Sequence, residues 1–129
     1  LMRVDKECHL YDDWHDQLLC AKNMHEGDMA IAFSYSGLTQ EVLDGTAEAQ
    51  RHNCPVVAVT KVDGSSKLAT MADAVLGVAA SEPLVRSGAM ASRMAQLMVV
   101  DALYAAYVAS DYERATHVIK QNYIEKQER

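Results

Sequence analysis

The sequence predicts an α/β fold with a parallel β-sheet, and the order of its apolar segments supports this class. Three short runs are apolar at consecutive positions, Met29–Phe33, Pro55–Thr60 and Ala74–Ala79. Continuous runs of this kind are typical of strands that are covered on both faces of a parallel sheet. A helix-length segment separates the first two runs and a shorter segment separates the last two, so the predicted order is βαβαβ.

Upstream of these strands, the pattern predicts one further strand and one helix. Cys8–Tyr11 has the character of a weak strand. Asp13–Met24 predicts a helix that is capped by Asp12 or Asp13 and closed near Gly27, because aspartate is a favoured N-cap and glycine a favoured terminator.

Three further segments predict helices. Thr39–Gln50 links the first two predicted strands. Ser87–Ser110 is apolar on most sides and therefore needs contacts on most sides, so we expect part of it to lie on the sheet and part on another subunit. Tyr112–Tyr123 carries a narrow apolar stripe on a polar helix.

Composition limits the possible classes of protein. The chain has 129 residues, 50% of them hydrophobic and 23% charged, with a formal net charge of −6. These values are typical of a soluble globular protein, and we expect residues 1–129 to form a single domain. A negative charge without runs of Lys or Arg opposes nucleic-acid binding by this domain, which would need a basic surface.

The cysteines and the apolar runs indicate a cytoplasmic protein. Cys8, Cys20 and Cys54 are odd in number and lack CxxC spacing, so we expect reduced packing residues and neither disulfides nor a zinc site. The apolar runs are far shorter than a membrane span, so no membrane partner is expected. The chain starts at Leu1 without a secretory leader, and we expect it to be cut from something longer.

The loop after the first predicted strand is the strongest candidate site. Ser34, Ser36 and Thr39 offer hydroxyl groups around Gly37, which lacks the side chain that would keep an anion from the backbone. The N-terminus of the following helix would add N–H groups and a positive dipole end. The simpler alternative is a polar turn with a threonine cap. The position at the carboxyl end of a strand favours an anion site.

Other motifs for phosphate binding or hydrolysis are missing from the sequence. It contains neither G-x-x-x-x-G-K-[ST] nor G-x-G-x-x-G, which opposes nucleotide cofactors, and no cofactor or metal is predicted. The G-x-S-x-G elbow of serine hydrolases is absent as well. The stretch Lys61–Ser66 follows the second predicted strand and would border the site, although a solvated turn is the better interpretation of it.

Several blocks in order resemble a known family, the SIS (sugar isomerase) domain. The resemblance is carried by Ala30–Glu41, Pro55–Thr60, Leu68–Leu76, Arg86–Leu97 and Asp101–Leu103. The last two blocks are most similar to the ligand-binding half of RpiR-type transcriptional regulators. The resemblance implies a three-layer, flavodoxin-like sandwich that binds a phosphorylated sugar through Ser34, Ser36 and Thr39. It also implies homodimers or homotetramers built partly on the long helix.

The chain departs from the family pattern in two ways. The family's first strand, with its glycine- and serine-containing loop, has no counterpart before Leu1, so we expect one wall of the site to be missing. Arg86 lies near the position where isomerases of this fold carry a glutamate. An arginine cannot act as a base but can hold a phosphate, so Arg86 and Ser87 are predicted to contact the ligand at the start of the long helix.

The sequence thus predicts a sugar-phosphate sensor domain of an RpiR-like regulator, without catalytic residues. Two alternatives stay open. The first is an aldose–ketose phosphate isomerase that uses Glu82 or His117 as its base. The second is a folded remnant with no working site.

Overall fold

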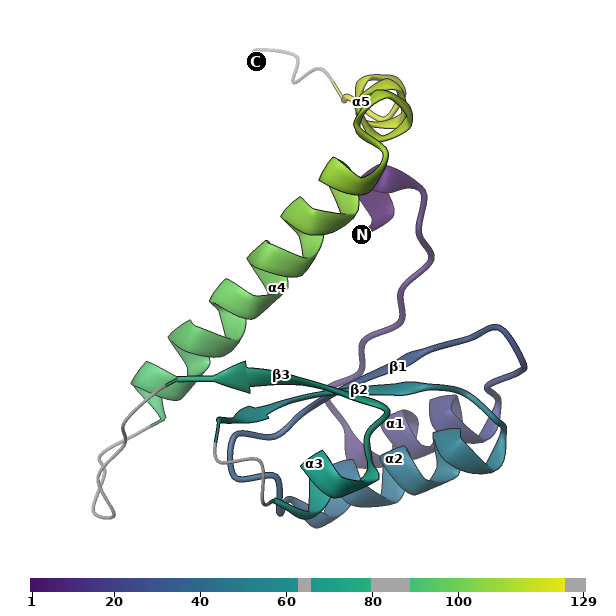
Figure 1. The fold of residues 1–129 in the computed structure, drawn as a ribbon. Helices are drawn as coiled ribbons and strands as arrows, with labels where there is room; N and C mark the ends of the chain where they lie inside the picture. Colours follow the sequence, from purple (N-terminus) through teal and green to yellow (C-terminus); the bar gives the residue numbers. More distant parts are fainter. Residues whose placement is uncertain (63–65, 80–88, 125–129) are drawn as a thin grey trace, which may run out of the picture. The chain divides into compact units, whose positions relative to one another are not determined.

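The computed structural model describes residues 1–62, 66–79 and 89–124, which divide into two compact units (Figure 1). One unit contains Leu10–Val99 and holds the β-sheet. The other combines Leu1–His9 with Val100–Arg129. The predicted loop site lies in the first of these units.

The sheet is parallel and, in the described part of the chain, has three strands. They are β1 (Ala30–Phe33), β2 (Val56–Lys61) and β3 (Ala74–Val78), in the order β1-β2-β3. β1 pairs with β2 from Ala30 opposite Val56 to Phe33 opposite Val59. The predicted α/β class and the predicted strands are therefore confirmed, with ends that shift by one residue at most.

Burial differs among the three strands. β2 is the central strand, and four of its six residues are buried. β1 is only partly buried, and β3 exposes Ala74, Val75 and Gly77. The expectation that the strands are buried fits β2 best, whereas both outer strands keep exposed residues.

Three helices lie on one side of this sheet, as Figure 1 shows. They are α1 (Trp14–Lys22), α2 (Gln40–Arg51) and α3 (Lys67–Met71). α2 packs against β1 and β2, α3 packs against β2 and α2, and α1 packs against α2.

Two small clusters of buried side chains attach α2 to the sheet. Leu43 packs with Ala58 and Leu68, and Ala49 packs with Cys54 and Val56. Leu43 and Ala49 lie on either side of Thr46, the third buried residue of α2, and the three recur at three-residue spacing. This packing fixes where α2 begins, and therefore where the candidate loop ends.

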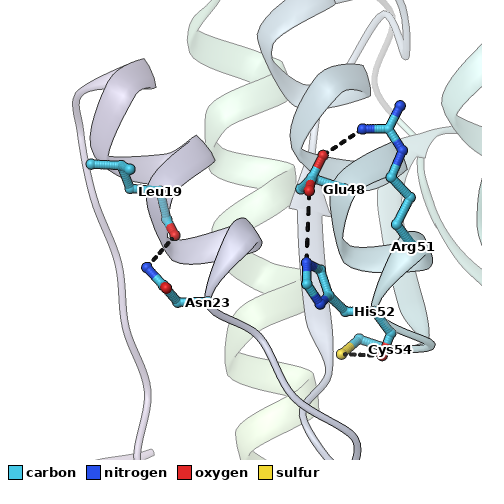
Figure 2. Close-up of polar contacts among 6 residues, drawn as sticks. All are labelled: Leu19, Asn23, Glu48, Arg51, His52 and Cys54. Carbon is cyan, nitrogen blue, oxygen red and sulfur yellow. Dashed lines mark hydrogen bonds and ion pairs between the residues drawn. The ribbon is translucent and has the colours of Figure 1, made fainter.

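α1 ends earlier than predicted. Asp13 caps its start by accepting hydrogen bonds from the backbone N–H groups of His15 and Asp16. The helix stops at Lys22 rather than Met24, because Asn23 takes the C-cap position and its Nδ2 donates to the Leu19 carbonyl at 2.8 Å (Figure 2). Gly27 has the positive φ expected near the end of the turn.

Cys8–Tyr11 is not a strand, so that prediction is wrong. A β-strand needs a hydrogen-bonded neighbour, and the sheet described here pairs only β1, β2 and β3. The Tyr11 carbonyl instead accepts a bond from Gln17 Nε2 at 2.7 Å, and Leu10 is 86% exposed.

The connection from α2 to β2 is held by polar contacts (Figure 2). Glu48 accepts a bond from Arg51 at 2.6 Å, and its other oxygen lies 3.7 Å from His52 Nε2.

The buried Cys54 thiol faces the carbonyls of His25 and His52, at 3.1 and 3.6 Å. Burial raises the pKa of this thiol, and the nearby Asp28 carboxylate raises it further. Cys54 is therefore an unreactive packing residue.

The second unit is helical. It contains the short 3-10 helix η1 (Met2–Val4), the later part of α4 (Met90–Ser110) and α5 (Tyr112–Gln121). η1 packs against α5, with Val4 and Ala115 buried. Lys6 Nζ lies 5.9 Å from the Tyr107 ring centroid.

The two predicted C-terminal helices are confirmed, while residues 87–88 of the first lie outside the described residues. No helix in the described residues is long and apolar enough to cross a membrane.

Thr46 gives a first testable prediction. Its hydroxyl is buried on α2 and has no hydrogen-bond partner among the described residues, and the side chain is 3% exposed. Because an unpaired buried hydroxyl costs free energy, Thr46→Val is expected to raise the free energy of unfolding by about 1 kcal/mol. Urea denaturation measures this change, and a loss of stability would contradict the assignment of an unpaired hydroxyl.

Candidate functional site

The candidate loop runs from the end of β1 to the start of α2. The Ser34 N–H donates to the Val59 carbonyl at 3.1 Å, which holds the start of the loop to β2. The loop ends at Thr39, the N-cap residue of α2, whose backbone is extended with φ −65° and ψ 115°. This is the strand, loop and helix order that the sequence predicts.

The loop hydroxyls form a local hydrogen-bond system. Ser34 Oγ lies 2.8 Å from Thr39 Oγ1 and accepts a bond from the Gly37 N–H at 3.1 Å. Ser36 Oγ accepts a bond from the Leu38 N–H at 3.2 Å. Ser34 is 5% exposed, whereas Ser36 and Thr39 are exposed. Ser34 therefore shapes the loop from inside, whereas Ser36 and Thr39 are residues at its surface, with the Thr39 hydroxyl bonded to Ser34.

The Thr39 side chain does not cap the start of α2. It occupies the N-cap position but makes no side-chain bond to the helix, because its hydroxyl faces Ser34 instead. The N–H groups of a first helical turn have no partners within the helix, and the positive end of the dipole lies there. The loop can therefore bind an anion with exposed hydroxyls and backbone N–H groups.

Gly37 is required by both its conformation and its surroundings. Its φ is 65°, in the left-handed region that side chains disfavour. A Cβ built at this position would collide with the Ser66 side chain and lie 3.0 Å from Thr60 Oγ1. The loop backbone therefore rests directly on these two residues.

Thr60 is a candidate supporting residue that the sequence analysis missed, and Ser66 belongs to the stretch Lys61–Ser66 that was interpreted as a solvated turn. Thr60 Oγ1 donates to the Tyr35 carbonyl at 3.2 Å, and Ser66 Oγ caps α3 by accepting from the Ala69 N–H at 3.2 Å. The signal in the sequence was a threonine at the end of a strand and a serine before a helix. Ser66 is 6% exposed, so it is not part of a solvated turn, whereas residues 63–65 lie outside the described residues.

The other predicted site residues lie outside the described part of the unit that holds this loop. Glu82, Arg86 and Ser87 all lie outside the described residues. His117 lies on α5, in the other compact unit, with an exposed side chain. Ser34, Ser36, Gly37 and Thr39 are thus the predicted residues that the structure brings together, and their role in binding stays a prediction.

Two other features of the described chain were considered as sites. A shallow hollow of about 250 Å³ lies between α1 and α2, and it contains none of the predicted site residues. Its lining carries both signs of charge and consists of Leu18, Lys22, Asp44, Ala47, Glu48 and Arg51. In the part of the chain that the structure describes, no three His, Cys, Asp or Glu side chains gather closely enough to hold a metal ion.

Comparison with known proteins identifies the family. Residues 8–106 match the family model of the SIS domain. The chain belongs to the SIS domain family. The resemblance of its sequence blocks to this domain is thereby confirmed, and the match includes both the candidate loop and the sheet.

The similar proteins are longer transcriptional regulators. An uncharacterized HTH-type transcriptional regulator of Caldanaerobacter subterraneus is 40% identical over 110 residues, which are 85% of this chain and 39% of that protein. The HTH-type regulator YbbH of Bacillus subtilis is 33% identical over 92% of this chain and 42% of its own length. This chain therefore spans about two-fifths of the length of the curated relatives that it matches.

A solved structure supports the same assignment. The NanR protein of Vibrio vulnificus, in complex with ManNAc-6P, is 28% identical with a TM-score of 0.82. The similarity covers 93% of this chain and 45% of that one. The SIS fold is thus confirmed, and the predicted likeness to the ligand-binding half of regulators agrees with the HTH-type relatives.

Gly37 provides the second testable prediction. Gly37→Ala is expected to lower the free energy of unfolding by about 2 kcal/mol or more, because it adds left-handed backbone strain and a collision with Ser66. Gly45→Ala is the matched control. Gly45 lies in α2 with open space around a built Cβ, so this variant should gain about 0.5–1 kcal/mol. Equal effects in urea denaturation would contradict the role assigned to Gly37.

Proposed function

We propose that this SIS domain is the phosphosugar-sensing domain of an HTH-type transcriptional regulator. The observation that carries the proposal is the Ser34–Thr39 loop, which combines exposed hydroxyls with an open helix N-terminus. The bound phosphosugar in the similar NanR structure supports it, as do the regulator relatives. A cytoplasmic location follows from this role and is part of the proposal.

In the proposed complex, the phosphate of the ligand lies at the mouth of the loop. The hydroxyls of Ser36 and Thr39 donate to phosphate oxygens, together with N–H groups of the first turn of α2. Ser34 keeps its bond from the Gly37 N–H and so maintains the shape of the loop. Arg86 and Ser87 add contacts from the start of the long helix, as the sequence predicts.

The chemistry of the loop favours binding over catalysis. Residues 34–39 contain the aliphatic hydroxyls of Ser34, Ser36 and Thr39 and the phenol of Tyr35, and neither a carboxylate nor an imidazole. Hydroxyl and amide groups stabilise a phosphate, but they are poor acceptors for a proton from carbon. The protonated Arg86, which the sequence places near the position of the isomerase glutamate, supports the same interpretation. Sensing is therefore the proposed role.

We propose that the regulator acts as a homodimer or homotetramer through α4. Met90, Met94, Leu97 and Met98 recur at three- and four-residue spacing and are 58% to 78% exposed. An apolar stripe of this kind is costly in water and is suited to a second copy of the same helix. A ligand that favours one arrangement of subunits would then reposition the DNA-binding domains of the regulator.

Thr39 provides the binding test. Thr39→Ala should weaken ManNAc-6P binding by about 1.5–3 kcal/mol, or roughly ten- to a hundredfold, because it removes a hydrogen bond to a charged group. Thr70→Ala removes an exposed hydroxyl on α3 and should bind like the wild type. Calorimetry with ManNAc-6P, glucose 6-phosphate and inorganic phosphate measures these affinities. Unchanged binding in Thr39→Ala, or no binding of any probe by the wild type, would contradict the proposal.

The oligomer proposal has a separate test. Replacing Leu97 and Met98 by glutamate places two carboxylates in the apolar stripe, so the subunits should dissociate. Light scattering after size-exclusion chromatography would then report the mass of a monomer. Thr70→Glu, which adds a charge to an exposed position of α3, should keep the wild-type mass. A monomeric wild type would overturn this proposal.

A further inference from the structure

Two buried residues with hydroxyl side chains pack against the candidate loop. Thr60, near the end of β2, is fully buried, and Ser66, before α3, is 6% exposed. The Gly37 backbone lies so close to both that a side chain at this position would collide with Ser66. Both residues are buried, whereas Ser36 and Thr39 are exposed residues of the same loop.

Hydrogen bonds form a directed chain from α3 to the loop. Thr60 Oγ1 donates to the Tyr35 carbonyl at 3.2 Å. Its hydrogen is therefore committed, and in the 3.5 Å contact between the two hydroxyls Ser66 must be the donor. Ser66 Oγ in turn accepts from the Ala69 N–H at 3.2 Å. These hydrogen bonds connect the N-terminus of α3 to the Tyr35 carbonyl of the loop through Thr60.

Two backbone bonds follow the same path. The Lys61 N–H donates to the Tyr35 carbonyl at 3.1 Å, and the Leu68 N–H donates to the Gly37 carbonyl at 3.0 Å. The loop is thus attached at Tyr35 and at Gly37, the residues on either side of Ser36. Ser36, whose hydroxyl accepts the bond from the Leu38 N–H, lies between these two attachment points.

We propose that Thr60 is a positioning residue for the anion site, an inference that rests on the proposed function. Thr60 is fully buried and acts through the loop rather than on the ligand. Its bond fixes Tyr35, the residue before Ser36, so that the Ser36 hydroxyl already has the arrangement that a phosphate requires. A loop without this attachment must be ordered when the ligand binds, and the lost conformational freedom weakens binding.

The inference is tested by two identical substitutions at buried threonines. Thr60→Val removes a bonded hydroxyl under the loop, whereas the matched control Thr46→Val removes a hydroxyl that has no partner among the described residues. Calorimetry with ManNAc-6P, or with inorganic phosphate if that is the probe that binds, should show about three- to tenfold weaker binding for Thr60→Val. Thr46→Val should match the wild type. Thr60→Ser keeps the hydroxyl and should restore most of the affinity.

Hydrogen exchange supplies a readout that needs no ligand. In Thr60→Val the Leu68 amide, which donates to the Gly37 carbonyl, should exchange faster than in the wild type, while Thr46→Val should leave it unchanged. If Thr60→Val fails to fold, Ser66→Ala removes the next hydroxyl in the chain and is expected to weaken binding in the same way.

The outcomes distinguish this inference from the proposed function. Faster exchange and weaker binding in Thr60→Val, with rescue by Thr60→Ser, would support the positioning role. Binding by the wild type with an unchanged affinity in Thr60→Val would overturn it and leave the sensor proposal intact. No binding by the wild type of any phosphate probe would overturn the sensor proposal, and the positioning role with it.

Discussion

The parallel pairing of β1 with β2 is the constraint on which the candidate site depends. Phe33, the last residue of β1, lies opposite Val59, so both strands approach the same edge of the sheet together. The loop that leaves β1 consequently passes over Thr60, the residue after Val59. An antiparallel pair would have placed the end of β1 beside the start of β2, and the loop would have no buried hydroxyl beneath it.

This register also explains why the loop can keep an unusual shape. A glycine with positive φ, a buried serine and a cap residue that does not cap its helix would be unstable in an isolated peptide. Here the buried end of β2 and the start of α3 supply hydrogen bonds and steric contact from below. The neighbouring elements thus stabilise a backbone that leaves donors facing outward, as an anion site needs.

Two buried threonines show that residues of one type can have different structural roles, depending on their hydrogen-bond partners. Thr46 and Thr60 are both nearly inaccessible. The Thr60 hydroxyl joins two elements through the Tyr35 carbonyl, whereas the Thr46 hydroxyl has no partner within the described residues. Burial alone therefore does not identify a functional polar group. The hydrogen-bond partners of the buried group determine whether it organises a site or only lowers the free energy of unfolding.

The sequence by itself determined the strands, the helices after them and the loop at the carboxyl end of the first strand. These features depend on local spacing of apolar residues and on turn chemistry, both of which can be read from a short window. The candidate hydroxyls at Ser34, Ser36 and Thr39 were found in the same way. The resemblance of the sequence blocks to the SIS family is a separate observation, which the match over residues 8–106 confirms.

Only the tertiary structure decided which strands are buried, that Cys8–Tyr11 is not a strand of the described sheet and that Thr60 and Ser66 support the loop. Each of these depends on contacts between residues far apart in the chain. Tyr35 and Thr60 are separated by a complete helix, and no local pattern encodes the register that brings their oxygens to 3.2 Å. Long-range strand pairing creates that contact, so it becomes visible only once the sheet has formed.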